Sequence, residues 1–343
     1  MSSESFHHFK VTLHDELVGE GLKIGNELFI PVSLVEKGCN LKKHWNETAQ
    51  SLKLNLTNAN AFDINHYNSK GNYLHYDKNK VENWNVTFTP EGIPKAIYPH
   101  GAHFNPSTIA QYGLQHYSLY LKTNDVSNVS NKNKFLMVAN WFMHQQDSRG
   151  GWAYLFDHDF YPGRLAKLKA PWYSAIGLGM AMSVLSRAYF LTKNSNYRSC
   201  ALKAKTLFKT PSARNGVLAK FENKYLFYEE CPTNSPSFIL NGFMFSLIGL
   251  YDLFKATGNS EVKWLYDRGI SSLKRMLPLY DLGHRTAYDL THYTTDGGYP
   301  NVATWGYHIG HIHLLAALNS IEKDSKMNET LNRWKGYLKG KFL

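Results

Sequence analysis

Two adjacent glutamates, Glu229 and Glu230, stand shortly before one of the most apolar segments of the chain. A carboxyl group held against apolar walls has a raised pKa, which suits general acid or base catalysis near neutral pH. The alternatives are a solvated loop pair or charges that complement the positive N-terminus of the following helix. That helix is predicted over 238–257, opened by a serine N-cap and Pro236. Asn241 would lie in its first turn and could hold a ligand oxygen.

A second polar cluster precedes another apolar helix, within residues 287–315. Its tyrosines are too many for all of them to be core residues: Tyr288, Tyr293, Tyr299 and Tyr307. A phenol can donate or relay a proton within a dry site. Three histidines follow the tyrosines: His308, His311 and His313. They raise the possibility of a metal site, but no HExxH motif or carboxylate cluster accompanies them. Structural or substrate-contacting histidines are therefore favoured, and no metal is predicted.

The charge of the chain points to an anionic partner. Its formal net charge is +11, with a pI near 9.3, and such a field attracts nucleic acids, acidic membranes and acidic polysaccharides. Arg164 begins a basic stretch that is either a solvated surface or a clamp on an acidic substrate. Aromatic residues make up 14% of the chain; most must be core, but some could line a groove that stacks on sugars or bases.

Missing motifs exclude several classes of function. The sequence has no GxGxxG after a strand, no P-loop and no GxSxG, so nucleotide cofactors and serine hydrolysis are disfavoured and no cofactor is expected. It has no helix-turn-helix, RNP or zinc-finger pattern, which disfavours nucleic acid. The three cysteines are widely spaced and imply neither a disulfide framework nor a zinc module. No secretory signal and no membrane-length apolar stretch is visible, so we expect a soluble cytoplasmic protein without membrane insertion.

The pattern of hydrophobic residues predicts an α+β protein in two parts. Residues 1–97 form a β-rich region, and residues 98–343 form a helical domain. Strands are expected over 28–35, 52–56 and 84–89. Helices are expected over 105–122, 133–146, 172–193, 195–208, 238–257, 260–277, 308–322 and 326–340, with a hairpin insert near 150–158. Antiparallel helix pairs continuing for so long suggest an α/α toroid with its site in a central cleft, and an irregular helical bundle is the alternative.

Several segments, in the same order along residues 98–341, resemble the D-glucuronyl C5-epimerases of heparosan and heparan sulfate biosynthesis. These segments are IAQYGLQHYS, HQQDSRGGW, PWYSAIGLGMAMSVLSRAYFLTK, EECPTNSPSFILNGFMFSLIGLYDL, YDL with PNVATWGYHIGHI, and RWKGYLKG. The resemblance implies an α/α-toroid catalytic domain, usually dimeric, that converts D-glucuronate to L-iduronate within a polymer. It places the catalytic glutamate at Glu230 and the catalytic tyrosines at Tyr288 and Tyr307. It places substrate contacts at Gln111, Tyr112, Asn241, Asn301, Trp305 and His308.

This chain departs from the animal members of that family at several positions. Cys231 stands where they have a tyrosine after the glutamate, and Thr291 stands where they have an arginine after YDL. The carboxylate clamp must then come from elsewhere, with Arg164, Lys167 or a histidine as candidates. Only about twenty residues join two helices between which the animal enzymes carry a large β-barrel segment. The calcium site built partly in that segment is expected to be missing, as in a shorter, bacterial-type member.

Two other functions remain open from the sequence. A uronate polysaccharide lyase begins with the same proton abstraction at C5 and then eliminates the C4 substituent, and α/α toroids host such enzymes. A non-catalytic protein that binds acidic polysaccharide would also use the positive charge and the aromatic residues.

Overall fold

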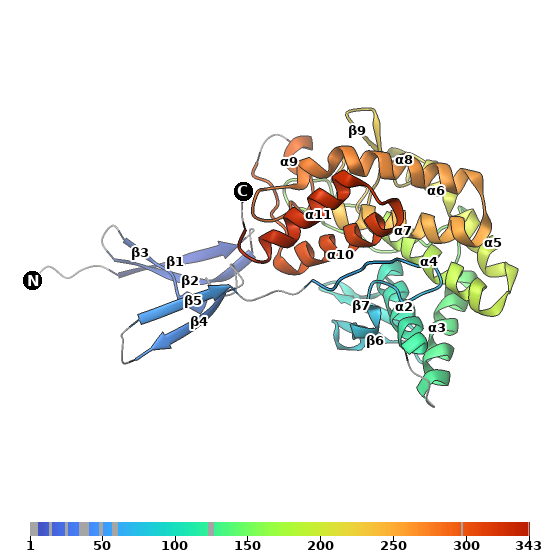
Figure 1. Ribbon diagram of the computed structural model, residues 1–343, viewed down its shortest axis with the longest axis horizontal. Coiled ribbons are helices and arrows are strands. Elements are labelled where there is room, and N and C mark those ends of the chain that lie inside the picture. Colours follow the sequence, from blue (N-terminus) through green and yellow to red (C-terminus); the bar gives the residue numbers. More distant parts are fainter. Residues whose placement is uncertain are drawn as a thin grey trace, which may run out of the picture.

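The computed structural model describes residues 6–13, 16–24, 27–33, 41–47, 51–56, 61–122, 127–295, 298–341 and 343. Figure 1 shows a body of packed helices from which strands β1 to β5 project on one side. The predicted α+β class fits this mixture of helices and small sheets.

The strands form small antiparallel sheets. β1 (Phe6–Leu13), β2 (Glu16–Ile24) and β3 (Glu27–Phe29) pair in that order, and β4 (Leu41–Asn46) pairs with β5 (Ser51–Leu56). A third sheet contains β6 (Val86–Phe88), β7 (Pro94–Tyr98) and β8 (Gly101–His103). A hairpin of β9 (Leu218–Phe221) and β10 (Tyr225–Tyr228) lies within the helical part of the chain.

The helical body contains long α-helices joined by shorter helical turns. The long helices are α2 (Pro106–Lys122), α3 (Ser127–His144), α4 (Ala175–Thr192), α7 (Leu240–Thr257), α8 (Ser260–Met276), α10 (Trp305–Glu322) and α11 (Ser325–Tyr337). The shorter ones are α5 (Ser195–Lys203), α6 (Lys205–Lys209) and α9 (Thr291–Thr294), with 3-10 turns at Tyr76–Lys78, Val81–Asn83, Ser212–Arg214 and Leu277–Tyr280. Nearly all the predicted helices are confirmed to within a few residues. The predicted closure of these helices into a toroid stays a prediction.

Asn105 caps α2 as the sequence predicts. Its side-chain oxygen accepts hydrogen bonds from the backbone N–H of Ser107 at 2.9 Å and of Thr108 at 3.2 Å. These bonds satisfy amide groups that have no partner within the helix itself. The cap fixes where α2 begins, and the buried face of α2 then packs against α3 and α4.

α4 and α7 cross at unusually close range in the centre of the body. A Cβ atom at Gly249 would lie 2.1 Å from the carbonyl oxygen of Gly179, and one at Gly179 would lie 2.6 Å from Ser246 Cα. Glycine at both positions therefore allows the two backbones to touch. α4 is long and apolar enough to pass a composition test for a membrane span, but 78% of it is buried inside the protein. Its contacts with α2, α5 and α7 account for its apolar composition.

A buried ion pair fastens the segment before α2 to this centre. Arg187 on α4 and Asp252 on α7 are both fully buried, with Arg187 Nη1 2.5 Å from Asp252 Oδ2. The hydroxyl of Tyr67 donates to the same carboxylate oxygen at 2.8 Å. Tyr67, Tyr73 and Val81 belong to the same hydrophobic core as the helices. The predicted domain boundary at residue 97 stays a prediction, but residues from 61 onward already contribute to the helical core.

Several local predictions differ from the structure. The strand predicted over 28–35 ends at Phe29, and residues 34 and 35 lie outside the described part of the chain. α7 begins at Leu240, not at residue 238, and the proposed serine cap is absent. The reason is Phe238, whose φ of 52° lies in the left-handed region and cannot continue a helix. The hairpin of β9 and β10 was not predicted. Three residues connect its strands, and Glu222 and Asn223 have φ values of 50° and 56°, as the two central residues of a type I′ turn require.

Candidate active site

The hairpin of β9 and β10 positions Glu230 at the start of α7. Glu229 and Glu230 directly follow β10. The side chain of Glu230 then lies against Gly242 in the first turn of α7, where a Cβ atom would come within 2.3 Å of Glu230 Oε2. Only glycine at position 242 leaves room for this carboxyl group. The positive end of the α7 dipole lies nearby.

Glu230 has the properties of a group that exchanges protons near neutral pH. Burial raises the pKa of its carboxyl to about 7, and the Gly242 amide and the Asn241 side chain offset part of that shift. Glu230 Oε2 and Asn241 Oδ1 are both buried and have no hydrogen-bond partner among the described residues. Buried polar atoms are nearly always paired, so two neighbouring ones without partners point to a ligand that completes the site.

Tyr288 and Tyr307 come together beside this carboxyl group. Their rings meet edge to face, with centroids 4.7 Å apart. Burial raises the pKa of both phenols, and the nearby charge of Glu230 raises both further. A hydrogen bond between the two hydroxyls raises the pKa of Tyr288 and lowers that of Tyr307. The structure thus brings the three predicted catalytic residues into one site.

Backbone pairing fixes Tyr288 between two other segments. Its carbonyl accepts from Leu240 N at 3.0 Å, and its own N–H donates to the carbonyl of Asn301 at 2.7 Å. The next residue, Asp289, is fully buried and accepts from the Asn301 side chain at 2.7 Å. Asp289 also accepts from the hydroxyl of Thr291 at 2.6 Å. Tyr307 lies in the first turn of α10, which Thr304 caps.

Glu229 has a different role from its neighbour. It is fully buried, and its carboxyl accepts from the hydroxyl of Ser237 at 2.7 Å and from Phe238 N at 3.1 Å. Burial raises its pKa to about 8, although these hydrogen bonds lower it. Glu229 therefore holds the loop between Cys231 and Phe238 in place, and its carboxyl oxygens are occupied by hydrogen bonds within the protein. The interpretation of this pair as a solvated loop does not apply, because neither side chain lies freely in solvent.

An apolar cluster surrounds the site. Its buried members are Tyr154, Phe156, Leu168, Trp172, Cys231 and Ile239, and Tyr98, Phe160 and Tyr288 pack against them. Burial raises the pKa of Tyr154 to a value far above that of a free phenol, and the charge of Glu230 adds to this shift. Burial also raises the pKa of the Cys231 thiol well above its ordinary value, so this thiol stays protonated. The segment carrying Tyr154 and Trp172 pairs with itself through a bridge between these two residues.

Other predicted substrate contacts lie elsewhere or have other partners. Gln111 accepts from the hydroxyl of Tyr76 at 3.4 Å, and Tyr112 packs against Phe88 and His116. These contacts tie both residues to the segment before α2. Arg164 donates from Nε to the hydroxyl of Thr295 at 3.1 Å. It therefore lies over the segment that follows α9.

His308 requires a correction. Its ring is fully buried, and its two nitrogens are bonded to Thr286 Oγ1 at 3.1 Å and to the carbonyl of Trp334 at 3.1 Å. No nitrogen is left for a substrate. Trp305 lies about one turn earlier on α10, against His308, whereas Tyr307 lies about 200° around the helix from Trp305 and about 100° from His308. His308 thereby connects α10 to α11. The indole N–H of Trp305 is buried and has no hydrogen-bond partner among the described residues, so its role as a substrate contact stays a prediction.

The remaining histidines of residues 287–315 have partners within the protein, whereas two of the tyrosines are exposed to solvent. His311 is fully buried against Thr286, and His313 accepts from Phe62 N at 2.8 Å. In the part of the chain that the structure describes, no group of three or more metal-ligating side chains gathers. Tyr293 is 57% exposed and Tyr299 is 92% exposed, so the four tyrosines are indeed not all core residues.

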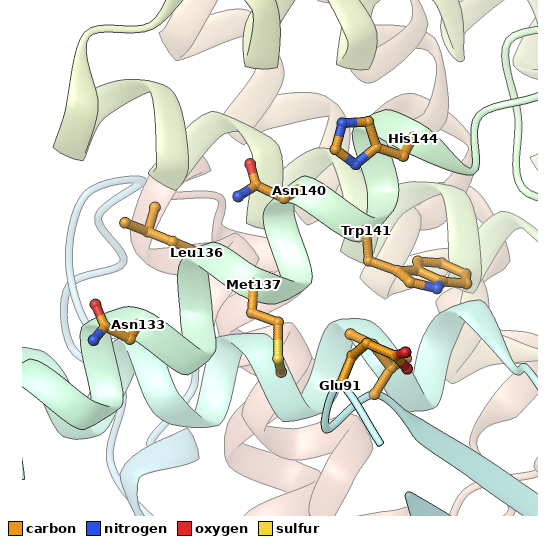
Figure 2. A pocket seen from close by; sticks show the side chains of 8 residues that line it. Glu91, Asn133, Leu136, Met137, Asn140, Trp141 and His144 are labelled. Atoms are coloured by element: carbon orange, nitrogen blue, oxygen red, sulfur yellow. The ribbon is translucent and has the colours of Figure 1, made fainter. Parts of the chain in front are cut away.

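A separate pocket of about 490 Å³ lies on one face of α3. Figure 2 shows Met137 and Trp141 pointing from this helix towards the turn that carries Glu91. None of the residues predicted for the site lines it.

Sequence reasoning missed Asp289 and Tyr154 as parts of the site. Asp289 directly follows Tyr288 in the YDL motif. Its position beside a predicted catalytic tyrosine could have indicated that it supports the site. Tyr154 gave no signal, because only the fold of residues 151–172 brings it beside Glu230.

A half-buried carboxyl group of raised pKa beside two phenols, on a helical scaffold, has the groups that acid–base chemistry requires. The family model for the D-glucuronyl C5-epimerase C-terminus matches residues 146–336, which include Glu230, Tyr288 and Tyr307. The chain belongs to the D-glucuronyl C5-epimerase family. It is 40% identical over 219 residues to the D-glucuronyl C5-epimerase of Caenorhabditis elegans, covering 60% of this chain and 35% of that protein. It is also 26% identical over 243 residues to an uncharacterized protein of Methanocaldococcus jannaschii, covering 64% of this chain and 77% of that protein. The chain thus spans about a third of the worm enzyme's length.

Proposed function

We propose that the chain epimerises C5 of D-glucuronate to L-iduronate within a heparosan-type polysaccharide. The observation that carries this proposal is the meeting of Glu230 with Tyr288 and Tyr307, in which the carboxyl charge acts on both phenols. Family membership supports the class of reaction.

The reaction needs a base on one face of the sugar ring and an acid on the other. One group removes the proton from C5, and the electron pair of the C–H bond moves onto the carboxylate to give an enediolate. The second group then returns a proton to C5 from the opposite face, which inverts the centre. We assign Glu230 to one face and Tyr307 to the other, with Tyr288 steering or relaying the proton through its contact with Tyr307.

The barrier sets what the site must supply. A useful rate requires a reduction of the barrier by well over ~8 kcal/mol. A positioned base contributes roughly a hundred- to ten-thousand-fold, which is about 3–5 kcal/mol. The remainder must come from orientation of the sugar and from stabilisation of the enediolate. Asn241, whose side-chain oxygen lies buried beside Glu230, is a candidate for holding the sugar, and Asn301 supports the backbone of Tyr288.

The remaining properties agree with an acidic polymer as substrate. Heparosan carries one carboxylate per disaccharide, and the formal net charge of +11 attracts such a chain. We also propose that the protein is a homodimer, by analogy with the family.

Incubation with heparosan in D2O tests this proposal. An epimerase incorporates deuterium at C5 and generates iduronate, with no change in chain length. A lyase generates unsaturated products that absorb near 232 nm and shortens the chain, whereas a non-catalytic binding protein does neither. Absence of deuterium at C5 under conditions where the protein binds heparosan would exclude the epimerase.

A further inference from the structure

Two histidines form a hydrogen-bonded pair next to the active-site cluster. His100 Nδ1 and His103 Nε2 are 3.0 Å apart, so one ring donates to the other. Tyr98 and Gly101 pair across a two-residue turn that contains His100, and His103 follows on β8. A short turn of this kind holds both rings in fixed positions. His100 is exposed to solvent and His103 is half-buried.

The pair rests on residues that surround the catalytic glutamate. The ring of His100 stacks on that of Tyr98, with centroids 5.4 Å apart and planes within 1°. The ring of His103 lies 4.9 Å from that of Phe156. Tyr98 and Phe156 both belong to the apolar cluster that contains Cys231, the neighbour of Glu230. The histidine pair therefore lies on the rim of the cluster that encloses the acid–base site.

The pair differs from most other histidines of the helical body in what its nitrogens contact. His308 and His311 are buried against Thr286, and His116 lies between Asn131 and Glu82. Among the described residues, His100 and His103 have hydrogen bonds only to each other, which leaves one nitrogen on each ring for a ligand.

The charged groups nearest the pair lie on residues 157–159 and on β7. Burial lowers the pKa of His158, Asp159 raises it, and His100 lowers it further. Asp157, on the same segment, is paired with Lys169 at 2.8 Å. Lys95, on the same sheet as the pair, lies 4.7 Å above the ring of Phe104. Asp159 is the other acidic group of residues 157–159, and its charge acts on His158.

We propose that His100 and His103 form a subsite for a negatively charged substituent, a carboxylate or a sulfate, on a sugar next to the one that reacts. This inference rests on the proposed function and specifies part of the polymer that the protein reads. With one nitrogen of each ring engaged in the bond between the two histidines, the second nitrogen of each ring can donate to the anion.

The test compares the His100→Gln/His103→Gln double variant with the wild type at pH 6. The substrates are a heparosan hexasaccharide, its N-sulfo form, and a form whose flanking carboxylates are reduced to alcohols. We expect KM of the variant to rise roughly two- to fivefold for the substrates with charged flanks, with kcat unchanged. For the reduced substrate, the two proteins should have the same KM. Comparison of the N-sulfo and N-acetyl forms shows which anion occupies the subsite.

His144→Gln is the matched control, because it removes an exposed histidine from α3, outside the cluster. It should leave KM unchanged for all three substrates. An equal rise of KM for the charged and reduced substrates would overturn the proposal, since the rings would then act by packing alone. Equilibrium binding of the same oligosaccharides is measured in parallel. If wild type and double variant bind them equally at pH 6, the subsite is refuted even if C5 exchange is observed, and a difference supports it even if no exchange occurs.

Discussion

Substitution of Gly242 tests whether the close packing of Glu230 against α7 positions its carboxyl group for catalysis. A Cβ atom at this position would lie 2.3 Å from Glu230 Oε2 and 2.4 Å from Glu230 Cβ, whereas ordinary contacts begin at 3.4 Å. The Gly242→Ala variant must therefore displace the carboxyl group by about 1 Å. A misplacement of ~1 Å costs about a hundredfold in rate. We expect kcat for deuterium exchange at C5 to fall about a hundredfold, which corresponds to ~2.7 kcal/mol of barrier.

The stability of this variant separates positioning from misfolding. Alanine favours the helix by up to ~1 kcal/mol over glycine, and overpacking costs about 1–3 kcal/mol, so the free energy of unfolding should change by no more than ~2 kcal/mol. Gly310→Ala on α10 is the matched control, because nothing lies within 4 Å of its added Cβ atom. It should keep full activity. A folded Gly242→Ala protein that exchanges deuterium at the wild-type rate would refute this reasoning.

Three further predictions concern ionisation and the core. If Glu230 is the base for D-glucuronate, its pKa of about 7 requires kcat/KM for that substrate to rise with pH through about 7, and a flat profile from pH 5.5 to 8.5 would contradict this assignment. The pKa of Glu229 is raised from 4.5 to about 8, so the folded state holds a proton that the unfolded state loses, and this contribution to stability is lost as pH rises from 4.5 to 8. Glu229→Gln should therefore lose less stability than the wild type over that window in urea unfolding, and equal losses would refute the shift. Asp252→Ala should cost about 3–5 kcal/mol in the same assay, because it leaves Arg187 buried and unpaired, and a loss below ~1 kcal/mol would show that the pair is not buried as described.

The sequence predicted the helices well because their signals are local. The Asn105 cap and the long apolar segments each determine structure within a few residues of themselves. The β9–β10 hairpin was missed because its two short strands resemble the end of a loop between helices. The start of α7 was misplaced because Ser235 and Pro236 imitate a helix start. The competing demand came from Glu229, which accepts the N–H of Phe238 and holds that residue out of the helix.

The candidate site was predicted only in part for a related reason. Glu230, Tyr288 and Tyr307 could be named because each lies in a distinctive short motif. The surroundings of His308 could not be predicted, because its partners Thr286 and Trp334 come from segments on either side of α10. Residue type and spacing showed that histidines cluster there, but only packing between segments distinguishes a buried structural histidine from a ligand.

Deuterium exchange in two single variants tests the central claim that Glu230 and Tyr307 act on opposite faces of C5. Glu230→Gln and Tyr307→Phe are each incubated in D2O with a glucuronate-containing polymer and, separately, with an iduronate-containing one. We predict that each variant loses exchange by at least about a hundredfold, and that the two differ in which epimer retains any residual exchange. Wild-type rates of exchange in both variants, with both polymers, would contradict the account.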